Sequence, residues 1–138
     1  MNQKSLKIAQ VAPLWIPVPP HNYGGIELML SMLTEELVRR KHDVTLFASG
    51  DSKTNAKSVF PTPKGIWLQH ELRSPHAIIS VLLKEVAEKM QDFEIIHNHF
   101  DFFSFPLALI KDRPPILTTV HRPLNHAYME AVRNYPEI

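Results

Sequence analysis

Short apolar runs and longer amphipathic segments alternate along the chain. Residues 7–12 and 44–48 are short and largely apolar, as the buried strands of a parallel sheet are. Between them, residues 26–40 repeat apolar side chains at helical spacing, which predicts an amphipathic helix. Glu27 falls off the apolar stripe and complements the helix dipole from the first turn. The strand, helix, strand order predicts a right-handed crossover unit.

The same alternation continues through the second half of the chain. The predicted strands are 93–97 and 116–120, with shorter candidates at 58–60 and 66–68, and the predicted helices run from 75 to 91, from 102 to 109 and from 126 to 133. Ser74, Asp101 and Asn125 precede these helices and are expected as N-caps. This order predicts the α/β class, with a Rossmann-like, doubly wound parallel sheet covered on both faces. Such sheets bind their ligands at the carboxyl ends of the strands.

The length, charge and amino-acid composition of the chain exclude several classes of function. The chain has 138 residues, 15 Lys and Arg against 14 Asp and Glu, and no cysteine. One globular domain is expected, and disulfides, thiol nucleophiles and cysteine-bound zinc are excluded. A net charge of +1 without a basic run argues against nucleic-acid binding. No stretch approaches the roughly 20 apolar residues of a membrane span, so we expect no integral membrane segment and a cytoplasmic location.

A glycine pair stands directly before the first helix. Gly24 and Gly25 would let the backbone approach an anion closely while the free N–H groups of the helix start face it. A sugar-nucleotide diphosphate is one ligand that fits, and the alternative is a simple turn into the helix. The pair belongs to neither a G-x-G-x-x-G loop nor a Walker A loop, which removes the main support for NAD or ATP chemistry.

Histidines stand at the ends of two predicted strands. His97 and His99, followed by Asp101, suggest either a metal site or hydrogen-bonded polar residues at a strand-to-loop junction. His121 follows the last strand and could orient a hydroxyl, accept a proton, contact a phosphate or be structural. Arg122 could reach a phosphate or be solvated.

A proline-rich segment, residues 13–20, follows the first strand. Four prolines make it a stiff extended loop that can be neither a helix nor a central strand. At this place it would overhang the carboxyl ends of the strands. It could line an acceptor pocket, touch a lipid interface or pack against its own domain.

Several motifs together resemble one family. They are Lys7–Pro13, Tyr23–Glu27 before an amphipathic helix, His42–Ala48, Phe93–His99 and Thr118–His121. In this order they resemble the N-terminal domain of family 4 (group 1) retaining glycosyltransferases, and the likeness covers almost the whole chain.

The resemblance implies a GT-B architecture, in which two Rossmann-like domains face each other across the active site and the N-terminal one mainly binds the acceptor. Such enzymes transfer a sugar from a nucleotide-sugar donor with retention, usually without a metal, so no cofactor is expected. Carried over, Gly24 and Gly25 approach the donor diphosphate and His121 lies beside the donor sugar as the catalytic residue. His97 and His99 line the floor of the cleft.

Tyr23 and Arg122 are expected beside them, lining the acceptor cleft. The expected partners are the nucleotide-sugar donor, a carbohydrate or lipid-linked acceptor with peripheral membrane contact, and a C-terminal domain. In this family the C-terminal domain carries the nucleotide site and an E-x7-E segment, and the chain stops before both. We therefore expect residues 1–138 to be an N-terminal fragment, inactive alone. The alternatives are a metal-dependent hydrolase built on His97, His99 and Asp101, and a non-catalytic Rossmann-like binding module.

Overall fold

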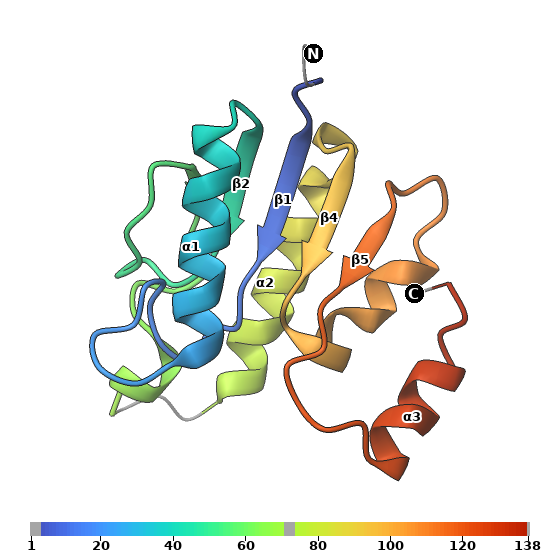
Figure 1. Ribbon diagram of the computed structural model, residues 1–138. Helices are drawn as coiled ribbons and strands as arrows, with labels where there is room; N and C mark the ends of the chain where they lie inside the picture. Colours follow the sequence, from blue (N-terminus) through green and yellow to red (C-terminus); the bar gives the residue numbers. More distant parts are fainter. Residues whose placement is uncertain (1–3, 71–73, 138) are drawn as a thin grey trace.

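A five-stranded sheet, parallel throughout, forms the centre of the molecule (Figure 1). The computed structural model describes residues 4–70 and 74–137. The strands are β1 Lys7–Val11, β2 Asp43–Phe47, β3 Lys57–Val59, β4 Ile95–Asn98 and β5 Ile116–Thr118, in the spatial order β3-β2-β1-β4-β5. The α-helices are α1 Gly25–Arg39, α2 Pro75–Lys89 and α3 His126–Arg133, and the 3₁₀ segments are η1 Ile66–Leu68, η2 Met90–Asp92 and η3 Asp101–Leu109.

Helices cover both faces of this sheet, which confirms the predicted α/β class. In Figure 1, α1 lies in front of the sheet and α2 behind it. The α2 side holds the larger core, where Phe47 and Ile96 from the strands pack with Leu82 and Val86 from α2. On the other side Leu30 of α1 is buried in a smaller cluster with Leu46 of β2 and Val18 of the proline-rich loop. The apolar stripe predicted for residues 75–91 is therefore the face that α2 buries.

The strand order places a topological switch point between β1 and β4. After β1 the chain crosses to β2 on one side, and after β4 it crosses to β5 on the other. The two strands pair with Gln10 opposite His97, so polar side chains from both meet near their carboxyl ends. Open α/β sheets bind ligands at this kind of position, because the diverging loops leave a crevice there.

The proline-rich loop packs against its own domain. Leu14 and Val18 are fully buried, while Trp15 and Ile16 are half-buried. The prediction of a strand at 66–68 is wrong: this segment is the 3₁₀ turn η1, whose Ile66 and Trp67 N–H groups bond the carbonyls of Leu14 and Trp15 at 2.8 and 2.9 Å. The carbonyl groups of the loop thus accept the hydrogen bonds that a neighbouring strand would accept in a sheet.

Of the three residues predicted as N-caps, two occupy the N-cap position and one of these makes a capping side-chain hydrogen bond. Asn125 Oδ1 accepts a hydrogen bond of 2.9 Å from the Tyr128 N–H at the start of α3. Ser74 occupies the N-cap position of α2 and Pro75 is the first residue of the helix, as predicted, but the Ser74 side chain makes no capping hydrogen bond. Asp101 is not a cap, because it is the first residue of η3, has a φ of 49° and turns its carboxylate to another partner.

Across residues 4–70 and 74–137, no helix has the length and hydropathy needed to cross a membrane.

Candidate functional site

A pocket of about 460 Å³ opens at the carboxyl ends of β1 and β4. We call it the carboxyl-end pocket. Its wall comes from the proline-rich loop, the start of α1, η1 and the segment after β4. Four of the predicted site residues line it: Tyr23, Gly24, Gly25 and Arg122. Tyr23 is on the rim, with 85% of its surface exposed.

Six of the fourteen residues that line this pocket are aromatic. Trp15 stacks on Trp67 with ring centroids 5.7 Å apart, and Phe100 and Phe103 meet Trp15 edge-on at 5.8 and 6.3 Å. Offset and edge-on pairs are the favourable arrangements of aromatic quadrupoles. The loop residue Trp15 therefore joins η1 to the segment after β4. The loop both packs against its own domain and lines this pocket.

The two glycines have different surroundings. Gly24 has a φ of 145°, and a Cβ there would lie 2.5 Å from Ile16 Cδ1 and 2.8 Å from Glu27 Oε2. A Cβ on Gly25 would meet no atom within 4 Å. The first helical bond runs from the Leu28 N–H to the Gly24 carbonyl, so the preceding N–H groups remain outside the helical pattern. Gly24 is thus required by backbone conformation and packing, whereas Gly25 leaves open space beside the helix start.

Glu27 is a site residue that the sequence pattern missed. The pattern placed it on the polar side of α1, yet it lines the pocket and only 5% of its surface is exposed. Burial raises the pKa of its carboxyl, and its own backbone N–H partly offsets that rise. The helical stripe could not reveal this burial, because the covering atoms come from the loop and from Gly24 rather than from the sheet.

The three predicted histidines form a cluster beside the pocket. His99 Nδ1 lies 3.0 Å from His121 Nε2, and the rings of His97 and His99 have centroids 3.9 Å apart. His97 Nε2 pairs with Thr119 Oγ1 at 2.7 Å. None of the three imidazoles lines the carboxyl-end pocket itself, but Arg122, the neighbour of His121 in the chain, does. The pocket and the cluster are therefore linked through the consecutive residues His121 and Arg122, which follow β5.

Gln10 sets the direction of the hydrogen bonds in this cluster. Its Oε1 lies 2.8 Å from His99 Nε2, and both side chains are buried. A carbonyl oxygen only accepts, so His99 Nε2 carries the proton and His99 Nδ1 is the acceptor. His121 Nε2 must then donate to it. In neutral His121 this leaves Nδ1 as a free lone pair.

Burial keeps the cluster uncharged. It lowers the pKa of His99 to about 3, with further lowering by His97 and His121. The pKa values of His97 and His121 are also lowered, mainly by burial, although the charge of Asp101 opposes the effect at His121. Neutral imidazoles bind hydroxyl groups as donors and acceptors, but they offer no positive charge to a phosphate.

Arg122 supplies the positive charge in this region. Its Nε donates to Asp101 Oδ2 at 2.8 Å, and its guanidinium lies 5.3 Å from the centre of the Phe102 ring. Asn98 shapes the turn that presents Asp101, since its side-chain amide donates to the Asp101 carbonyl at 2.9 Å. About half of the Arg122 side chain stays exposed, so a face of the guanidinium is available to a ligand.

The metal site of the alternative interpretation does not fit these contacts. Both nitrogens of His99 are engaged in hydrogen bonds, and Asp101 is held by Arg122. Within the described ranges, no three His, Asp or Glu side chains are arranged to hold a metal ion.

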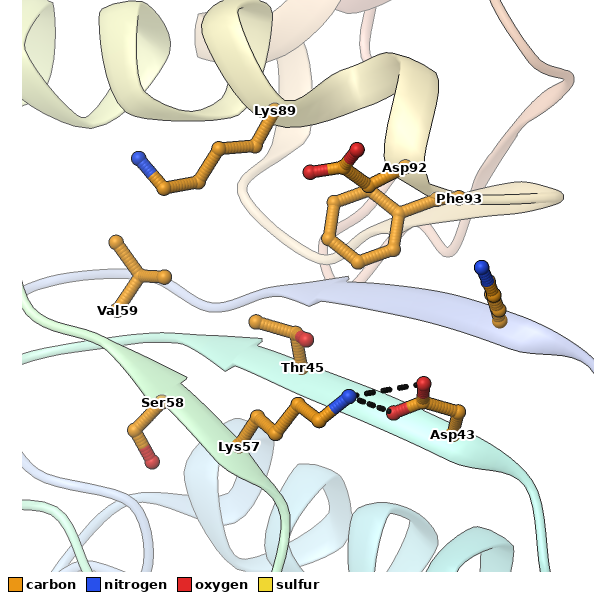
Figure 2. Close-up of a pocket in the computed structure, with 9 residues that line it drawn as sticks. Asp43, Thr45, Lys57, Ser58, Val59, Lys89, Asp92 and Phe93 are labelled. Atoms are coloured by element: carbon orange, nitrogen blue, oxygen red, sulfur yellow. Dashed lines mark hydrogen bonds and ion pairs between the residues drawn. The ribbon is translucent and has the colours of Figure 1, made fainter.

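A second pocket, of about 370 Å³, lies toward the amino ends of β1, β2 and β3 (Figure 2). Two of its three lysines have acidic partners: Lys57 Nζ lies 2.8 Å from Asp43, and Lys89 Nζ lies 2.6 Å from Glu85. Figure 2 shows the Lys57 ammonium directed at the Asp43 carboxylate. These paired charges and the position at the opposite end of the strands leave the carboxyl-end pocket as the candidate site.

The fold matches one Rossmann-like half of a GT-B glycosyltransferase. The solved structure of AviGT4, described as a glycosyltransferase involved in avilamycin A biosynthesis, is similar with a TM-score of 0.55 and 24% identity. The similarity covers 87% of this chain and 34% of that chain, so the chain spans about a third of AviGT4. At this identity the likeness shows the fold alone.

The family follows from the sequence profile of Glycosyltransferase Family 4, which matches residues 23–136. The chain belongs to glycosyltransferase family 4, as the resemblance in its motifs predicted. No curated protein matches it.

Proposed function

We propose that this chain is the acceptor-side domain of a retaining glycosyltransferase of the hexosyltransferase type. The enzyme would transfer a sugar from a nucleotide-sugar donor to a carbohydrate or lipid-linked acceptor, and a second domain would bind the nucleotide. A cytoplasmic location, with peripheral membrane contact where the acceptor is lipid-linked, belongs to the same proposal, as does a reaction without a metal cofactor.

One observation carries the proposal: in a family 4 domain, the carboxyl-end pocket and the His97, His99 and His121 cluster adjoin at the switch point of the sheet. A transferase must hold two substrates side by side. An aromatic pocket next to a group of neutral hydrogen-bonding side chains offers two adjacent binding regions of this kind.

The roles of the residues follow from their chemistry. His121, with its free Nδ1, would accept a hydrogen bond from a donor-sugar hydroxyl at the reacting centre. Gly25, whose surroundings are open, and the free N–H groups at the start of α1 would face the donor diphosphate. His97 and His99 would line the floor of the cleft, where His99 contacts His121. Tyr23 and Arg122 would line the acceptor site.

Retention fits a site without a basic residue at the reacting centre. In front-face transfer the leaving phosphate takes the proton of the attacking hydroxyl, so the protein needs only to position the reactants and stabilise charge. The lowered pKa values of the three histidines agree with this, because neutral imidazoles orient hydroxyl groups without holding a charge.

The test uses the enzyme that contains this chain. His121→Ala should lower turnover by about 100-fold or more while the fold is retained, as removal of a positioned polar group at a reacting centre does. His126→Ala, an exposed histidine on α3, is the matched control and should leave turnover unchanged. Equal turnover in both variants would remove His121 from the site. A coding sequence that lacks an E-x7-E segment after residue 138 would favour the binding module instead.

A further inference from the structure

A further pocket, of about 240 Å³, lies between α3 and the start of η3. We call it the α3 pocket. It adjoins the carboxyl-end pocket, because Phe102 and Arg122 line both of them. The residues that line the α3 pocket are Phe102, Arg122, Asn125, Ala127, Tyr128 and Ala131. The proposed function gives this pocket no role.

Small side chains on α3 make room for the α3 pocket, and aromatic rings border it. Ala127 and Ala131 are four positions apart, so they lie on the same face of the helix. The rings of Phe102 and Tyr128 meet edge-on, with centroids 6.0 Å apart. The methyl groups and the Phe102 ring therefore offer an apolar surface to a ligand.

Arg122 lines the pocket with its guanidinium held from two directions. Its Nε donates to Asp101 Oδ2 at 2.8 Å, and its Nη2 lies 2.7 Å from the same oxygen. Its carbon Cζ lies 5.3 Å from the centre of the Phe102 ring. Within the described ranges, Nη1 has no acceptor, and about half of the side chain is exposed. A guanidinium that is already oriented loses little conformational freedom when a ligand binds to its remaining edge.

The charge of the lining indicates the class of ligand. Among the described residues, Arg122 is the only charged residue that lines the α3 pocket. A guanidinium edge pairs with a planar carboxylate through two parallel hydrogen bonds. Asp101 already balances part of the positive charge, so the pocket suits one negative charge better than the two of a phosphate. The apolar surface beside Arg122 favours a carboxylate that is carried on an apolar or aromatic body.

We propose that the α3 pocket is a binding site for an organic carboxylate, whose anionic group bonds the free edge of Arg122 and whose apolar body packs on Phe102 and Ala131. The site goes beyond the proposed function, since sugar transfer is assigned to the carboxyl-end pocket and the histidine cluster. A carboxylate in the α3 pocket would lie beside the substrates of that reaction, because Arg122 borders both pockets.

NMR titration of the full 138-residue chain measures this binding. The ¹⁵N-labelled chain is titrated at pH 7 with benzoate, which has both a carboxylate and a flat apolar body. Benzoate should saturably shift the backbone signals of Ala127 and Ala131 and the Nε–H signal of Arg122. Benzamide has the same shape without the charge, and acetate has the charge without the ring. Each should bind about 10-fold more weakly than benzoate, and inorganic phosphate should also bind more weakly.

Two variants test the two parts of the site. Ala131→Leu fills the pocket without changing its charge and should abolish benzoate binding. Arg122→Gln removes the cation and should weaken binding by about 10- to 100-fold, the effect of losing hydrogen bonds to a charged group. Arg133→Gln is the matched control, because Arg133 is an exposed cation in the last turn of the same helix and should not affect binding.

Circular dichroism checks that each variant folds. If Arg122→Gln does not fold, the comparison of benzoate with benzamide on the wild type tests the role of charge in its place.

Four results would overturn the inference. They are no saturable shift with benzoate, equal affinity for benzamide, tighter binding of phosphate than of benzoate, and unchanged benzoate binding in Ala131→Leu. The titration measures binding alone, so its result is independent of the turnover of His121→Ala, which tests the proposed function.

Discussion

Gly24 and Gly25 have different surroundings, so we expect alanine substitutions at the two positions to change the stability of the fold differently. Gly24→Ala places a Cβ in contact with Ile16 and Glu27 and forces a non-glycine residue to a φ of 145°. We expect it to lower the free energy of unfolding by about 1–3 kcal/mol. Gly25→Ala enters open space at a helical position and should be neutral or slightly stabilising. Urea unfolding of both variants measures the difference, and equal stabilities would contradict this account.

The hydrogen bonds between Gln10 and His99 and between His99 and His121 predict which ring nitrogen of each histidine carries the proton. In the wild type, ring ¹⁵N shifts should show His121 protonated at Nε2 and unprotonated at Nδ1, because Gln10 Oε1 fixes His99 and His99 Nδ1 then accepts from His121. Gln10→Leu removes the first acceptor, so His121 should become a mixture of tautomers.

Gln10→Glu is the control for this experiment, since a carboxylate also only accepts and should keep the wild-type pattern. A wild-type His121 that carries its proton on Nδ1 would show that the hydrogen bonds run the other way.

At the scale of elements, η1 and the proline-rich loop depend on one close contact. A Cβ on Gly65 would lie 2.8 Å from Ile16 Cα and 2.9 Å from the Trp15 carbonyl oxygen. Gly65→Ala should therefore push the loop away and destabilise the fold by about 1–3 kcal/mol. It should also change the fluorescence of Trp15 and Trp67, whereas Gly25→Ala should leave it unchanged. Wild-type fluorescence and stability in Gly65→Ala would mean that the loop is not held by this contact.

The elements that periodicity defines were predictable from the sequence. Helix α1 and strands β1, β2 and β5 lie within about two residues of the predicted bounds, because buried faces impose regular spacing on apolar side chains. The segment 66–68 was mistaken for a strand, since three apolar residues carry no period and their hydrogen bonds go to a loop distant in sequence.

The candidate site was only partly predictable, for a related reason. Strand ends identified His97, His99 and His121, because topology brings carboxyl ends together. Their hydrogen-bond partners could not be predicted from the sequence, since Gln10, the partner of His99, lies on β1, far away in sequence. Glu27 escaped because loop atoms cover it, and loop packing leaves no regular pattern. Asp101 was identified, but its pairing with Arg122 was not, since the two residues are 21 positions apart. The proposed function therefore depends on the family membership of the chain, because the site residues alone do not identify a reaction.

For the whole molecule, the buried histidines predict acid sensitivity. The pKa of His99 falls from 6.5 to about 3 on folding, so the unfolded chain binds more protons than the folded one between these values. The free energy of unfolding should therefore be highest above pH 6.5 and should fall with decreasing pH, by up to about 1.4 kcal/mol per pH unit for one such histidine. His97 and His121 add in the same direction, and Glu27, whose pKa is raised, opposes it nearer its own range.

Urea unfolding between pH 7 and 5 measures this slope above the range in which most carboxylates titrate. In His99→Gln, whose side chain does not titrate, the free energy of unfolding should depend less steeply on pH. His76→Gln, an exposed residue of α2, should keep the wild-type slope. The same slope in all three proteins would show that His99 is not the source.

The buried anchors of the proline-rich loop have a consequence for affinity. Leu14 and Val18 are fully buried, so the conformational freedom of this segment is lost when the chain folds and not when a ligand arrives. A wall that is already ordered spares the ligand the entropic cost of ordering it, and this preorganisation raises affinity without any added contact. The stability of the domain and the affinity of its pocket are thus linked: a substitution that loosens the loop would transfer part of the folding cost to every binding event.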